Sequence, residues 1–201
     1  MSERPFHHGN LRAVLLDEAV TVLRGSGVDG LSLRDLARRA GVSHGAPRSH
    51  FVDRQALLDA LAVTGFERLT AAVRRALARS GDDLDGRFRA VARAYVDFAI
   101  DEAALMELMF QAKESGGGGP TAESAATLFA VLDGAMGPRP GDGGDEDART
   151  TFGMLFAATM QGIAALVASR RLERTHADGL IDAATDMMLA SDLRARAVTE
   201  R

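Results

Sequence analysis

The chain has 201 residues, of which 46% are hydrophobic, so it carries enough apolar side chains for a packed core and a wholly disordered protein is excluded. It lacks Cys, which excludes disulfides and thiolate metal sites, and its single Tyr, missing Trp and few β-branched residues favour an all-helical fold. The formal net charge of −4 argues, taken alone, against a nucleic-acid partner.

The first helix is expected from Asn10, a suitable N-cap, to about Arg24, where apolar residues recur three and four positions apart. The preceding segment, MSERPFHHGN, has no apolar stretch of the signal-peptide kind, and no run approaches 18 apolar residues. We therefore expect no signal peptide and no membrane span. The absence of Cys agrees with a cytoplasmic location.

Residues Leu31–Phe51 predict two short helices joined by a tight turn. Ser32 is a good N-cap, and Asp35 stands three residues later to complete a capping box. Gly41 suits a left-handed helix exit, and Ser43 offers a second N-cap. A capped helix, a glycine turn and a second capped helix form a helix-turn-helix, which places its second helix in a DNA major groove.

The local charge supports this interpretation. Residues 32–54 hold five Arg and two Asp, a net charge of +3, which leaves −7 for the rest of a chain whose total is −4. A basic segment on an acidic body is typical of a small DNA-binding domain attached to a larger regulatory domain. A randomly mixed helix surface is the alternative explanation.

Further helices are expected at residues 53–79, 84–100, from 101 onward, 121–136, 148–171 and 176–193. Asp53 caps the first of these, and residues 137–147 predict a flexible loop. The fold prediction is thus all-α with about nine helices. Residues 1–55 form a DNA-binding domain with three helices, residues 56–201 form a second domain, and the helix at 53–79 links the two.

The segments GLSLRDLARRAGVS and GAPRSHFVDRQALL carry a resemblance to a known family. His50-Phe51, Arg54 and Leu57-Leu58 stand in the register of the family motif. Residues 10–58 thereby resemble the DNA-binding domain of the TetR family of transcriptional regulators. The match covers about a quarter of the chain.

The residues expected to contact DNA lie in and beside the second helix, predicted from Ser43 to His50. A helix N-terminus and polar or cationic side chains suit phosphate oxygens, and an Arg also reads guanine. The candidate DNA-binding residues are Ser32, Ser43, His44, Gly45, Arg48, Ser49, His50 and Arg54. His50 has a second interpretation, as a residue that hydrogen-bonds locally to end the helix, and Phe51 is expected in the core.

Two residues depart from the family pattern. Arg48 stands where the family usually has Tyr, and Pro47 stands where Leu is common. Because Pro lacks an N–H and disfavours helix at the preceding residue, we expect a recognition helix with a distorted first turn. The operator sequence therefore does not follow from relatives.

The second half resembles the ligand-binding domain of one branch of the family, which usually has Trp-His-Gly in its penultimate helix. Here the triplet is Met160-Gln161-Gly162, so only the Gly is kept. Apolar and sulfur-containing side chains adapt to varied ligands. The candidate pocket residues are Tyr95, Met106, Met109, Phe110, Phe129, Phe156, Met160 and Gln161. The competing interpretation of each Met and Phe is ordinary core.

The last two predicted helices are expected to pair with those of a second copy in a four-helix bundle. Small residues on them, among them Gly153 and Gly162, permit close helix approach. A homodimer also suits a palindromic operator, because two half-sites one turn apart need two recognition helices.

The sequence therefore predicts a TetR-like repressor that a small apolar molecule releases from its operator. The alternative is a helical interaction module that has lost sequence-specific DNA binding. An enzyme is not expected, because no nucleophile elbow, phosphate loop or convergent carboxylate pair is present. No cofactor is expected, and no metal, because His7 and His8 have no Cys or carboxylate at ligand spacing.

Overall fold

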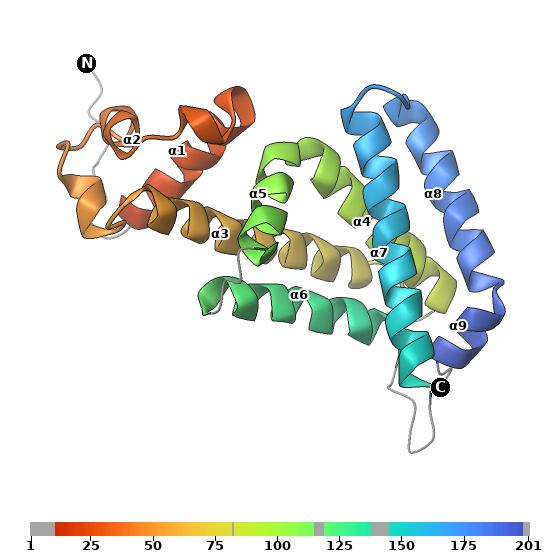
Figure 1. Ribbon diagram of the computed structural model, residues 1–201. Coiled ribbons are helices and arrows are strands. Elements are labelled where there is room, and N and C mark those ends of the chain that lie inside the picture. Colours follow the sequence, from red (N-terminus) through yellow and green to blue (C-terminus); the bar gives the residue numbers. More distant parts are fainter. Residues whose placement is uncertain (1–10, 82, 115–118, 138–144, 199–201) are drawn as a thin grey trace. The chain divides into compact units, whose positions relative to one another are not determined.

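The computed structural model describes residues 11–81, 83–114, 119–137 and 145–198, so Asn10, His7 and His8 lie outside the described residues. Within these ranges the chain forms nine α-helices and two short 3-10 helices, without a strand (Figure 1). The all-helical prediction is confirmed. The chain divides into two compact units. The N-terminal unit is Met1–Gly65 with Ala104–Ala122, and the C-terminal unit is Phe66–Ala103 with Glu123–Arg201.

The N-terminal unit contains α1 (Leu11–Ser26), η1 (Val28–Gly30), α2 (Leu33–Arg39), η2 (Ala46–Ser49), the first half of α3 (Arg54–Leu77) and most of α5 (Ala103–Glu114). Among its core side chains, at most 1% exposed, are Leu15, Leu23, Leu36, Phe51, Leu57 and Leu61. The expected core position of Phe51 is therefore confirmed. Helices α3 and α5 approach closely at Gly65, where a Cβ atom would lie 2.5 Å from Sδ of Met109.

Local capping chemistry sets the starts of α2 and α3. The N-caps at Ser32 and Asp53 are as predicted, but the Asp35 carboxylate accepts from Arg38 and Arg39 and does not complete the expected capping box. Oγ of Ser32 accepts a hydrogen bond from the backbone N–H of Asp35 at 3.0 Å. Oδ1 of Asp53 accepts from the N–H of Ala56 at 2.8 Å. Gly41 has φ of 68°, the left-handed conformation that a Gly adopts without steric cost. The caps thus fix where α2 and α3 begin, and Gly41 turns the chain between α2 and η2.

The C-terminal unit contains the second half of α3, α4 (Leu84–Asp101), most of α6 (Pro120–Ala135), α7 (Glu146–Ala168), α8 (Arg174–Leu189) and α9 (Asp192–Ala197). Helix α7 packs against α4, α8 and α9, and α8 also packs against α4. In the core the ring of Phe88 meets those of Phe152 and Phe156 edge-on, with centroids 5.4 and 5.5 Å away. Such edge-to-face pairs stabilise a core beyond the area that they bury.

Two predicted helices differ in the structure. The final helix, expected at 176–193, is divided into α8 and α9, because Oγ of Ser191 accepts from the N–H of Arg194 at 3.3 Å and begins a new helix. The segment expected as a helix from Ser43 to His50 contains only the four-residue η2. The described residues thus form the predicted number of α-helices, but the one expected from Ser43 to His50 is missing and α9 is additional.

Helix α7 bears on the membrane prediction. Among the described helices it is long and apolar enough, by length and composition, to cross a membrane, whereas no such run was expected. This is weak evidence for a membrane, because a single apolar helix that packs within a protein passes the same test. Met154, Leu155 and Leu166 of this helix are exposed in the single chain.

Candidate nucleic-acid interface

The second element of the helix-turn-helix is a 3-10 turn and not an α-helix. The backbone N–H groups of Ala46, Arg48 and His50 each donate to the carbonyl three residues earlier, at 3.0–3.1 Å. Gly45 precedes the turn, and Ser43 forms no side-chain cap at its start. The physical reason is Pro47, which is buried and has no N–H to continue an α-helical ladder. The expected distortion therefore affects the whole element, not its first turn alone.

Six of the eight predicted DNA-binding residues are exposed on and beside this turn: Ser43, His44, Gly45, Arg48, Ser49 and His50. A hollow of about 470 Å³ lies between the turn and the start of α2. Its lining is Leu33, Arg34, His44, Gly45 and Arg48. The fold thus brings together His44, Gly45 and Arg48 around one surface depression, while Oγ of Ser49 donates to the Ala46 carbonyl at 2.7 Å.

Arg34 is a candidate site residue that sequence reasoning missed. It lies in the first turn of α2, is exposed, and borders the same hollow as Arg48. The signal was available, since Leu36 is a buried position of this short helix and Arg34, two residues earlier, lies on the side away from it. Within the described residues, neither Arg34 nor Arg48 makes an ion pair with a carboxylate of the chain, so both cations are available to an anionic partner.

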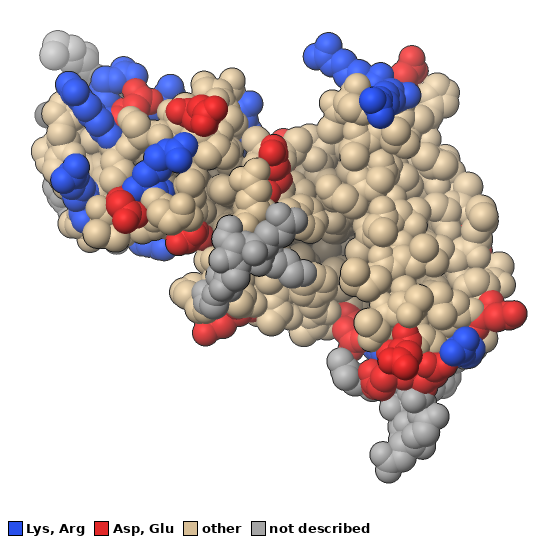
Figure 2. All heavy atoms as spheres, viewed as in Figure 1, with Lys and Arg blue, Asp and Glu red and all other residues tan. Residues whose placement is uncertain are grey.

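The other two arginines of α2 are engaged. Asp35 accepts from Nη2 of Arg38 and from Nε of Arg39, both at 2.7 Å. These hydrogen bonds, first that of Arg39 and then that of Arg38, lower the pKa of the Asp35 carboxyl. Figure 2 shows basic side chains spread over the surface of α1, α2 and the start of α3, with fewer acidic ones between them. The N-terminal unit thus carries the positive surface that its local charge predicted.

The remaining two predicted DNA-binding residues have partners inside the protein. The Ser32 hydroxyl serves as the N-cap of α2. Arg54 donates from Nη2 to the Val28 carbonyl at 2.6 Å and from Nε to the Leu31 carbonyl at 3.3 Å.

The predicted ligand residues fall in both units. Met106, Met109 and Phe110 belong to the N-terminal unit, and the other five belong to the C-terminal unit. Within the latter, Oη of Tyr95 donates to Oε1 of Gln161 at 3.0 Å, so the two predicted polar residues are in contact. Burial raises the pKa of Tyr95 to about 12, which keeps this hydroxyl protonated as a donor.

Exposure separates the other members of the predicted pocket. Met106, Met109, Phe156 and Met160 are buried, whereas Phe110 and Phe129 are more than 40% exposed. The four buried residues thus lie in the core of their units. Among the described residues, the hollow beside η2 and two hollows along α4 are lined by none of the eight predicted ligand residues.

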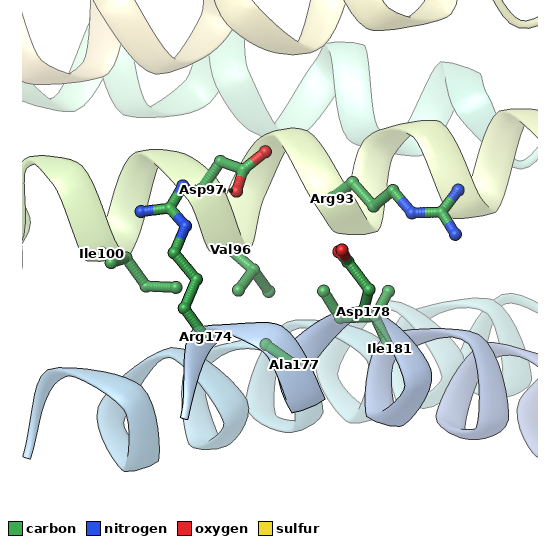
Figure 3. Close-up of a pocket in the computed structure, with 8 residues that line it drawn as sticks. All are labelled: Arg93, Val96, Asp97, Ile100, Arg174, Ala177, Asp178 and Ile181. Atoms are coloured by element: carbon green, nitrogen blue, oxygen red, sulfur yellow. Dashed lines mark hydrogen bonds and ion pairs between the residues drawn. The ribbon is translucent and has the colours of Figure 1, made fainter. Parts of the chain in front are cut away.

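One of the hollows along α4, of about 410 Å³, lies between α4 and α8 and is bordered by ion pairs (Figure 3). Arg174 reaches from α8 to Asp97 and Asp101 of α4, at 2.9 and 2.7 Å. Arg93 reaches from α4 to Asp182 of α8 at 2.6 Å. These ion pairs connect α4 and α8 at two places along the helices. The other hollow, of about 400 Å³, lies between the end of α3 and α4.

The described residues contain no group of three His, Asp or Glu side chains that would hold a metal ion.

Comparison with known proteins covers both parts of the chain. A family model described as "Tetracyclin repressor-like, C-terminal domain" matches residues 88–191, and one described as "Bacterial regulatory proteins, tetR family" matches residues 15–61. No curated protein matches the chain. A solved structure of a protein with unknown function from Rhodococcus sp. RHA1 is 41% identical. It matches over 97% of this chain and 100% of that chain, with a TM-score of 0.79.

Two further solved structures are less similar in sequence. The TetR family transcriptional regulator PfmR from Thermus thermophilus is 18% identical, over 89% of this chain and 98% of that one, with a TM-score of 0.58. A TetR variant from Acinetobacter baumannii, in complex with minocycline, is 21% identical, over 92% and 97% of the two chains, with a TM-score of 0.60. At these identities the likeness shows the fold alone. The family models, which together cover most of the helices, show that this chain belongs to the TetR family of transcriptional regulators.

Proposed function

We propose that the protein is a cytoplasmic repressor that binds a palindromic operator as a homodimer and leaves it when a small apolar molecule binds. Residues 1–55 act as the DNA-binding domain and residues 56–201 as the ligand-binding and dimerisation domain.

The observation that carries the DNA-binding part is the hollow between α2 and η2. It is bordered by Arg34, His44 and Arg48, and both arginines lack a carboxylate partner among the described residues. Leu33 contributes an apolar surface to the same hollow. Cations beside a partly apolar depression suit a DNA strand, since the guanidinium groups contact phosphate or guanine and the apolar surface contacts sugar or a thymine methyl group.

The dimer is supported by the outer face of α7 and α8. Over most of α7 this face shows no charged side chain (Figure 2). The exposed large apolar residues of these two helices are Met154, Leu155, Leu166, Leu180 and Met187. A Cβ atom at Gly162 would meet nothing within 4 Å in the single chain, so packing within the chain does not require a Gly there. An apolar, uncharged face with small residues fits a helix-to-helix interface between two copies.

The release step is supported by Tyr95 and Gln161, which meet in the C-terminal unit next to Met160, a fully buried residue of α7. A polar pair within an apolar region is the arrangement that orients a ligand. Binding would then shift the population of the dimer towards a form whose two reading elements no longer fit the half-sites.

A helical interaction module without DNA binding is the competing function, and η2 is the observation that favours it. A four-residue 3-10 turn presents fewer side chains to a major groove than an α-helix of two turns.

Fluorescence anisotropy with a labelled DNA fragment from upstream of the gene decides between the two. The repressor is expected to bind the fragment in preference to a scrambled fragment of equal length and to protect a palindrome from nuclease. Addition of a panel of apolar small molecules is expected to release the DNA in at least one case, and Tyr95→Phe should weaken that response. Equal binding to both fragments, or none to either, supports the interaction module.

A further inference from the structure

Arg54 ties together the two ends of the helix-turn-helix. It is the first residue of α3 and follows the short segment that connects η2 to α3. From there its side chain reaches back 26 residues, so that Nη2 donates to the Val28 carbonyl at 2.6 Å. Its Nε donates to the Leu31 carbonyl at 3.3 Å. One guanidinium at the start of α3 is thus bonded to η1 and to the first residue of the helix-turn-helix.

The accepting carbonyls lie where the chain changes direction. The Val28 carbonyl also accepts the N–H of Leu31 at 3.1 Å, which closes the 3-10 turn η1. Leu31 is 2% exposed and immediately precedes Ser32, the N-cap of α2. The two hydrogen bonds from Arg54 therefore fix the backbone at the point from which α2 starts.

The other side of the helix-turn-helix is anchored in the core. Pro47 and Phe51 are buried, and the guanidinium carbon of Arg12 lies 5.6 Å from the centre of the Phe51 ring. The exposed surface between these anchors holds Arg34 and Arg48. Their separation depends on how α2 is set relative to η2.

We infer that Arg54 is a positioning residue for DNA binding and not a phosphate contact, an inference that rests on the proposed function. The guanidinium sets the start of α2 and thereby the distance between Arg34 and Arg48. Two of its donor groups are used in doing so. A Lys carries its donors on a single nitrogen and cannot reproduce two bonds that leave different nitrogens of a rigid fork.

A salt titration separates positioning from phosphate contact. Each phosphate contact contributes roughly 0.9 to the slope of log K against log salt. The proposal predicts that Arg54→Ala and Arg54→Lys each lower affinity for the upstream fragment by about tenfold, the loss expected from charged hydrogen bonds, without changing the slope. Arg34→Ala is the matched control on the same surface, and it should lower the slope by about one. A lower slope in Arg54→Ala, with full recovery in Arg54→Lys, overturns the proposal.

Amide hydrogen exchange of the DNA-free protein tests, independently of DNA, whether Arg54 fixes the start of α2. Arg54→Ala should speed exchange of the Asp35 and Leu36 amides about tenfold, because the hydrogen bonds of both amides end on Ser32. Gln55→Ala, which removes only a hydrogen bond to Asp59, should leave these amides unchanged. Unchanged exchange in Arg54→Ala overturns the proposal. If the wild-type protein binds no DNA but the exchange result is as expected, the proposed function is wrong, whereas the positioning of α2 by Arg54 is supported.

Discussion

Nε of Arg149 donates to Oδ1 of Asp133 at 2.7 Å, and the Arg149 side chain is only 2% exposed. Its Nη2 donates to the carbonyls of Asp133 and Gly137, at 2.7 and 3.0 Å. Through Nη1 it also reaches the Ala197 carbonyl at the end of α9, at 3.4 Å. One buried cation of α7 thus joins the end of α6 to the end of α9.

Removing this cation should cost much stability. Arg149→Ala would leave the Asp133 carboxylate and three carbonyls without the cation that they surround, a loss expected to lower the free energy of unfolding by about 3–5 kcal/mol. Urea unfolding at a fixed protein concentration measures it. Arg171→Ala is the control, because Arg171 is exposed just beyond the end of the same helix, and its effect should stay within about 0.5 kcal/mol. An equal, small effect of both variants would contradict the account.

The N-cap of α7 should make stability depend on acid. The backbone N–H of Ala148, and after it the guanidinium of Arg196, lower the pKa of Asp145 from its ordinary value of 3.8. A carboxylate whose pKa is lowered by folding stabilises the protein fully above that ordinary value. The contribution is lost as the pH falls through the lower, folded-state pKa.

Asp145→Asn keeps an oxygen that accepts from Ala148 but removes the charge. The melting temperature of the wild-type protein should therefore fall more steeply than that of the variant between about pH 5 and 3. Asp147→Asn, in the same helical turn, is the control and should follow the wild-type curve. If the melting temperatures of wild type and Asp145→Asn fall in parallel with pH, the charge of Asp145 does not contribute to the acid dependence of stability.

The proposed dimer makes a prediction at Gly162. In the single chain a Cβ atom there meets open space, so Gly162→Ala should stabilise α7 by about 1 kcal/mol through helix propensity alone. In a closely packed interface the same methyl group should push the helices apart and weaken dimerisation. Sedimentation over a range of concentrations distinguishes the outcomes. Gly134→Ala in α6, also without neighbours, is the control. A dimer as tight as wild type would place the interface elsewhere.

Pro47 should govern which DNA sequence is read. Pro47→Leu restores a backbone N–H and permits an α-helical turn where η2 now stands. Such a change re-aims the side chains of His44 and Arg48, while the cations themselves remain. Selection from a random DNA library should therefore give a different consensus for the variant, with a similar salt slope. An unchanged consensus would mean that η2 already adopts an α-helix on DNA.

The parts of the fold that sequence predicts well are those set by neighbouring residues. Ser32, Gly41 and Asp53 act within three or four positions of themselves, so their caps and turn follow from local chemistry. Pro47 is recognisable as a disturbance for the same reason. The extent of that disturbance cannot be predicted from the sequence, because a 3-10 turn and a distorted α-helix differ only in the carbonyl to which each N–H donates.

The contacts that sequence could not predict join distant segments. Arg54 stands at a position of the family motif and was predicted to contact a DNA phosphate. Its hydrogen bonds to the carbonyls of Val28 and Leu31 depend instead on a turn that begins 26 residues earlier. The burial of Arg149 depends on the ends of α6 and α9 meeting at one place in α7. Neither pairing leaves a periodic signal in the chain.

If the surface around Arg34 and Arg48 contacts DNA phosphates, as proposed, the affinity for DNA must fall with rising salt concentration. Anisotropy titrations of the upstream fragment over a series of salt concentrations give the slope of log K against log salt. We expect a steep slope for the wild-type protein and a slope smaller by about two in the Arg34→Ala, Arg48→Ala double variant. Binding that does not respond to salt, or a double variant with the wild-type slope, would contradict the proposal.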